Sequence, residues 1–92
     1  MVGLLTIELH LPDSRSLKDK RRIVRALKDR LRGRFNVAVA ETEFQDLHQR
    51  GAIEIVTAAA DAVALDARLR SVEEEAERIL AGALLRSAIR LL

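Results

Sequence analysis

Apolar residues recur with two different periods along this chain of 92 residues, and the order of those periods is the strongest constraint on its fold. Residues 4–11 alternate large apolar side chains with polar or smaller ones, which is typical of a half-buried β-strand. The apolar positions of this strand are Leu5, Ile7, Leu9 and Leu11.

A helical period follows from Ser16 to about Gly33. Ser16 with Asp19 three residues later resembles a capping box at the helix start, and Gly33 suits a C-cap. At 100° per residue, one side of this helix gathers Leu17, Ile23, Val24, Leu27 and Leu31. The opposite side carries Lys18, Arg21, Arg22, Arg25, Lys28 and Arg32.

Further patterns complete the chain. Strand periods cover residues 36–43 and 52–59, with a polar connection over 44–51. Asp61 can cap a second helix that ends near Gly82, and its apolar stripe is Leu65, Leu69, Val72, Ala76 and Ile79. A last strand alternates Leu85, Ile89 and Leu91 with Arg86, Ala88 and Arg90.

This β-α-β-β-α-β order predicts an α+β fold, a ferredoxin-like sandwich with a four-stranded antiparallel sheet and two helices on one face. Right-handed crossovers place the first and third strands in the centre and leave the other sheet face open. With 49% hydrophobic and 33% charged residues, we expect a single domain over residues 1–92. Cysteine is absent, and no apolar run suggests a membrane span or a signal peptide, so we expect a cytoplasmic protein with no membrane partner.

The net charge of +2 conceals a strong asymmetry. Residues 16–34 contain nine cations and two acids, a local charge of +7, and the rest of the chain sums to −5. Such a helix face is either a solubility surface or a polyanion-binding surface, and the near absence of interleaved acids favours structured RNA or the ribosome as partner. The predicted polyanion-binding residues are Lys18, Arg21, Arg22, Arg25, Lys28 and Arg32. Since only Phe35 and Phe44 are aromatic, we expect contacts to phosphates rather than base stacking on the sheet.

The predicted topology brings residues 13–21 and 41–50 to one end of the molecule, because the first two strands run parallel and end on the same side. Two interpretations remain open for this corner. In the first, Lys20 reaches Glu41 or Glu43 in a network that fixes the middle connection, and Lys20→Ala costs about 1 kcal/mol. In the second, the helix N-terminus forms an anion site. Its residues would be Ser14, Arg15, Ser16 and Lys20.

No residue pattern indicates catalysis. Glu41, Glu43, Asp46 and His48 have ligand chemistry, but acids at this spacing are usually solvated, so we expect no metal and no cofactor. The two histidines lie in no nucleophile motif, and the four glycines are isolated, so no phosphate-binding loop is present. We expect a non-enzymatic protein.

The open sheet face predicts self-association. Short apolar side chains such as Ala38, Ala40 and Val56 form a shallow surface, and Glu8 and Glu54 would meet Arg86 or Arg90 of a second copy. A homodimer through this face or through a strand edge is expected, and a monomer is the alternative. The alternative function is a homo-oligomeric interaction module that binds a small anion or an acidic protein partner.

Five segments of the chain carry a family resemblance: residues 10–12, 14–21, 35–41, 45–47 and 49–50. These segments closely resemble the YlxP-like family of small bacterial proteins of unknown function. The resemblance implies a ferredoxin-like fold, a bacterial cytoplasmic origin and, because members are often encoded beside translation and ribosome-maturation factors, an RNA-related role. The chain departs from the family pattern at His48, where Trp is common, and at residues 59–60, where Ser-Asn is common.

Overall fold

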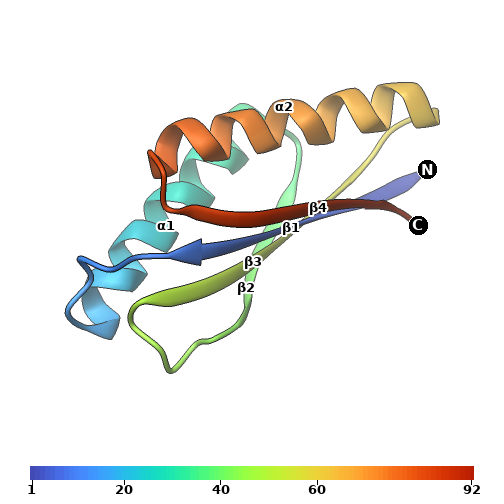
Figure 1. Cartoon of the computed structure of the whole chain (residues 1–92). Helices are drawn as coiled ribbons and strands as arrows, with labels where there is room; N and C mark the ends of the chain where they lie inside the picture. Colours follow the sequence, from blue (N-terminus) through green and yellow to red (C-terminus); the bar gives the residue numbers. More distant parts are fainter.

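The computed structural model describes Met1–Leu92 and contains six elements in the predicted order (Figure 1). They are β1 (Val2–His10), α1 (Leu17–Arg34), β2 (Ala38–Glu43), β3 (Arg50–Ala58), α2 (Ala62–Leu80) and β4 (Leu84–Leu91). The strands form one antiparallel sheet in the order β2-β3-β1-β4, so β1 and β3 are central. Both helices cover the same sheet face in Figure 1, and the other face is open. The predicted ferredoxin-like fold is confirmed.

The core lies between the sheet and the two helices and is aliphatic. The predicted alternation holds, because the side chains of β1 and β3 that face the helices are fully buried, whereas most of their neighbours are not. The residues of the whole core are Leu5, Ile7, Leu9, Val39, Ile53 and Ile55 from the sheet, Leu11 from the segment after β1, Val24, Leu27 and Leu31 from α1, and Leu65, Leu69, Val72, Ala76 and Leu80 from α2. A Cβ on Gly3 would lie 2.7 Å from Leu69 Cδ1, so a residue without a side chain lets α2 approach β1 closely. Neither helix is both long and apolar enough to cross a membrane.

Both predicted N-caps are present. Ser16 Oγ accepts a hydrogen bond from Asp19 N at 3.1 Å, and Asp61 Oδ1 accepts one from Ala64 N at 2.8 Å. The predicted C-cap of the first helix at Gly33 is wrong. The Phe35 N–H still donates to Leu31 O at 2.9 Å, and Phe35 packs against the core, so α1 continues through Arg34.

Two register shifts in the sheet change which side chains face the helices. Leu9 pairs with Leu84 and Glu8 pairs with Arg86, so Leu85 is an extra residue in β4. Leu85 is therefore 55% exposed, and Leu84 takes the half-buried place that the period-two pattern assigns to Leu85. In β2 the extra residue is Thr42, so Glu41 pairs with Ile53 on the helix side, whereas Glu43 pairs with Ala52 on the open side.

Candidate nucleic-acid interface

The outward side of α1 is a cationic surface with few internal partners. Lys18, Arg21, Arg22 and Arg25 are exposed and, together with Ala26 and Asp29, line an open depression on this side. We define the basic face as Lys18, Arg21, Arg22, Arg25 and Lys28. None of these five side chains forms an ion pair, so their charges lack compensation within the chain.

Arg32, the sixth predicted polyanion-binding residue, differs from the basic face. Its Nη2 donates a hydrogen bond to Val39 O of β2 at 3.3 Å. Since β2 is an edge strand, this contact covers one backbone acceptor of the edge and ties the end of α1 to the sheet. Arg32 is still exposed and lies at the border of the basic face.

Both aromatic rings of the chain have a guanidinium over them. Arg50 Cζ lies 4.3 Å from the ring centroid of Phe44, and Arg34 Cζ lies 5.7 Å from that of Phe35. One side of each ring is therefore used within the chain.

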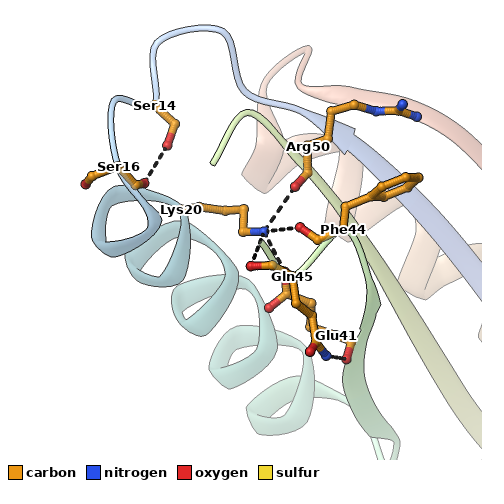
Figure 2. A network of polar contacts seen from close by, with 7 residues as sticks. All are labelled: Ser14, Ser16, Lys20, Glu41, Phe44, Gln45 and Arg50. Atoms are coloured by element: carbon orange, nitrogen blue, oxygen red, sulfur yellow. Dashed lines mark hydrogen bonds and ion pairs between the residues drawn. The ribbon is translucent and has the colours of Figure 1, made fainter. Parts of the chain in front are cut away.

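Lys20 organises the corner between the start of α1 and the connection from β2 to β3 (Figure 2). Its ammonium donates hydrogen bonds to Phe44 O at 2.6 Å and to Arg50 O at 3.1 Å, with Gln45 O at 3.4 Å. Nζ also lies 3.1 Å from Glu41 Oε2, and the Lys20 side chain is only 1% exposed. The predicted bridge from Lys20 to Glu41 or Glu43 is confirmed for Glu41, whereas Glu43 is exposed on the open side. The Lys20 contacts hold both ends of the connection against α1.

The four predicted anion-binding residues lie at the start of α1 and before it, but the Lys20 ammonium is directed to the connection from β2 to β3 and contacts none of the other three. The Ser14 hydroxyl is buried and donates to Ser16 O at 3.2 Å, and the Lys20 ammonium is surrounded by oxygen atoms. The carboxylate of Asp19 already accepts the N–H of Arg15 at 3.0 Å. Anion binding stays a prediction, for which Arg15 and Ser16 supply the accessible groups.

Sequence reasoning missed a charged cluster between the two helices. Glu75 is only 1% exposed, and its Oε2 accepts a hydrogen bond from Arg34 Nη1 at 2.7 Å and lies 2.8 Å from Arg78 Nη2. Arg30 Nε lies 3.7 Å from the other carboxylate oxygen, Oε1. Glu75 is one of three consecutive glutamates, so nothing in the sequence singles it out as the buried one. We call Arg30, Arg34 and Arg78 the arginine triad.

The remaining titratable groups named in the sequence analysis, and Arg70, lie mostly at the surface. On the exposed side of α2, Arg70 donates a hydrogen bond to Asp66 at 2.9 Å, and this contact raises the pKa of Arg70, which is charged at any physiological pH. No three His, Asp or Glu side chains lie close enough together to hold a metal ion. Glu41 is engaged by Lys20, whereas Glu43, Asp46 and His48 are exposed.

The fold defines a class, the ferredoxin-like α+β proteins, here with a basic face on α1 whose five cations form no ion pair. Within that class, the chain belongs to the family described as "Protein of unknown function (DUF503)", whose model matches residues 2–88. It is also 31% identical to "Uncharacterized protein YlxP" of Bacillus subtilis (strain 168) over 81 residues, which is 88% of this chain and 80% of that protein. The family resemblance that the sequence motifs indicate is confirmed.

Proposed function

We propose that this protein binds structured RNA or the ribosome through phosphate contacts to the basic face of α1. One observation carries the proposal: the five cations of this face have no ion-pair partner, and Asp29 is the only acid among them. A surface that serves only solubility usually interleaves acids and bases, because alternating charges stabilise an exposed helix. Such a partner would place the protein in the cytoplasm.

The shape of the basic face fits a sugar-phosphate backbone. Lys18 and Lys28 lie ten residues apart on one helix, which corresponds to about 15 Å at the rise of an α-helix. Cations along such a length can contact several phosphates at once, and each contact releases counterions from the nucleic acid. Because phosphates carry no base identity, the proposed binding has little sequence preference.

Co-sedimentation with ribosomes at two salt concentrations, with anisotropy titrations on a labelled ribosomal RNA hairpin, tests the proposal. We expect binding at low salt, and a logarithm of affinity that falls by about four units per tenfold rise in salt if four to five phosphates are contacted. Absence of binding at low salt would contradict the proposal. Competition by inorganic phosphate at constant ionic strength would favour a small-anion module instead.

We propose as a second candidate that two copies associate through the open sheet face. The register aligns Ala38, Val56 and Leu4 in one row across β2, β3 and β1, and Val56 is 37% exposed. This row is apolar, and its side chains are short or of medium size, which suits packing of one sheet on another. The edge of β2 is less suitable, since it has the bulge at Thr42 and the contact from Arg32.

The charges on the open face also differ from the sequence expectation. Glu8 lies 3.7 Å from Arg86 of the same chain, so this pair is satisfied without a second copy. Glu54 and Arg90 have no ion pair and stand two strands apart on β3 and β4. A two-fold axis that runs parallel to the strands and lies above β1 would place β4 of each copy over β3 of the other. Arg90 of each copy would then lie near Glu54 of the other copy.

Light scattering at micromolar concentration measures this association. We expect a mass near twice the 10.3 kDa of the chain, and a return to the monomer mass in Val56→Asp, because a buried carboxylate without a partner is costly. Arg25→Glu, on the opposite side of the molecule, is the control and should keep the dimer mass. A monomer mass for the unmodified protein would overturn the dimer.

A further inference from the structure

We propose that the arginine triad, Arg30, Arg34 and Arg78, is a second phosphate-binding site, which buried Glu75 holds in position. The proposal rests on the proposed RNA-binding function and extends it, because it places phosphate contacts on both helices. The ligand is a phosphodiester group of the same structured RNA that the basic face of α1 contacts.

The triad holds more positive charge than Glu75 needs for compensation. Three guanidinium groups surround a single carboxylate, which leaves a surplus of +2. One arginine would neutralise Glu75, and a bidentate pair would satisfy both of its oxygens. Two further cations at the same point repel each other unless an additional anion lies near them.

The carboxylate of the cluster is buried and its three guanidinium groups are exposed, which suits an anion site. The Glu75 side chain is 2% exposed, whereas those of Arg30, Arg34 and Arg78 are 69%, 57% and 65% exposed. Each guanidinium has five N–H donors, and the carboxylate engages only part of them. The remaining donors are available on exposed side chains whose position the carboxylate restricts, so less conformational entropy is lost when a phosphate binds.

The spacing of the two closest arginines fits one phosphate. Arg34 Nη1 and Arg78 Nη2 both lie within 2.8 Å of Glu75 Oε2, so these two nitrogens are at most about 5.5 Å apart. Two guanidiniums at this separation, one from each helix, can donate to different oxygens of one phosphate group.

The triad is also continuous with the basic face. Arg30 lies about two helical turns beyond Arg22 on α1. Ala26 stands between them on the helix surface, Gly33 adjoins Arg30, and both small residues are exposed. A Cβ on Gly33 would meet no atom within 4 Å. Small residues therefore leave an open path for a nucleic-acid backbone from Arg22 to the triad.

Anisotropy titrations on the labelled ribosomal RNA hairpin at several salt concentrations test the site. We expect Arg34→Gln with Arg78→Gln to lower the salt slope by about two units and the affinity by about tenfold or more. Arg30→Gln is the fold-safe variant, because its Nε lies 3.7 Å from the carboxylate and the two closer arginines remain. It should lower the slope by about one unit.

Arg70→Gln is the matched control, since Arg70 is an exposed arginine of α2 that pairs with Asp66 and lies outside the triad. We expect the salt slope of RNA affinity for Arg70→Gln to equal that of the unmodified protein. If the triad is purely structural, its variants would change the midpoint of unfolding but leave the salt slope of RNA affinity unchanged. That result would overturn this inference.

The outcomes separate this inference from the proposed function. If the unmodified protein binds the hairpin and Arg21→Glu with Arg25→Glu weakens binding, but the triad variants retain the salt slope of the affinity, only the second site is wrong. If the unmodified protein does not bind the hairpin at low salt, the proposed function and the second site are both wrong.

Discussion

Replacing Lys20 with alanine is expected to lower the free energy of unfolding by about 3 kcal/mol, the lower end of the range for breaking a buried ion pair. The ammonium is 1% exposed and holds two backbone carbonyls within 3.1 Å. Glu41 Oε2, 3.1 Å from Nζ in ion-pair geometry, is buried and has no hydrogen-bond partner, so the alanine variant leaves it without compensation. From the sequence alone we expect a loss of only about 1 kcal/mol, because the pair is then assumed to be partly exposed to solvent.

Urea unfolding followed by circular dichroism measures this loss. Lys18→Ala is the control, since Lys18 is exposed on the same helix, has no ion pair and should change stability by less than about 0.5 kcal/mol. Lys20→Arg should not restore stability, because a planar guanidinium cannot occupy a site shaped around a compact ammonium. A Lys20→Ala variant as stable as the control would show that the corner contributes little.

Replacing Arg21 and Arg25 with glutamate is expected to reduce RNA affinity on the order of 100-fold while the fold stays intact. Both residues are exposed on the basic face without ion pairs, so the change removes two phosphate interactions and adds two repulsive charges. The logarithmic salt slope should fall by about one unit for each phosphate interaction that is removed. Anisotropy titrations on the ribosomal RNA hairpin give both quantities.

A control variant shows whether RNA affinity depends on the basic face itself or only on the net charge of the protein. Arg70→Glu with Ala67→Glu and Ser71→Glu makes the same change in net charge on the exposed side of α2, away from the basic face. We expect it to keep the salt slope of the unmodified protein. Equal reductions in affinity in the two charge variants would mean that RNA responds only to overall charge, and unchanged binding in the Arg21 and Arg25 variant would refute the basic face.

The sequence by itself determined the order of elements, the sheet topology and the helix starts. These features are local or follow from simple connection rules: periods of two and 3.6 reveal strands and helices, and right-handed crossovers fix the sheet order. The caps at Ser16 and Asp61 depend on an amide three residues away, so they are visible in the sequence. The basic side of α1 follows from the helical period, because Lys18, Arg21 and Arg25 fall opposite the apolar stripe.

Only the tertiary structure decided how charges are paired across elements. The bulge at Thr42 turns Glu41 toward Lys20 and Glu43 toward the open face, although an unbulged strand would place both carboxylates on one side. Glu75 and Arg34 are 41 residues apart and meet only because the helices pack side by side on the sheet. Register shifts and contacts between helices depend on how whole surfaces fit together, and no period along the chain encodes them.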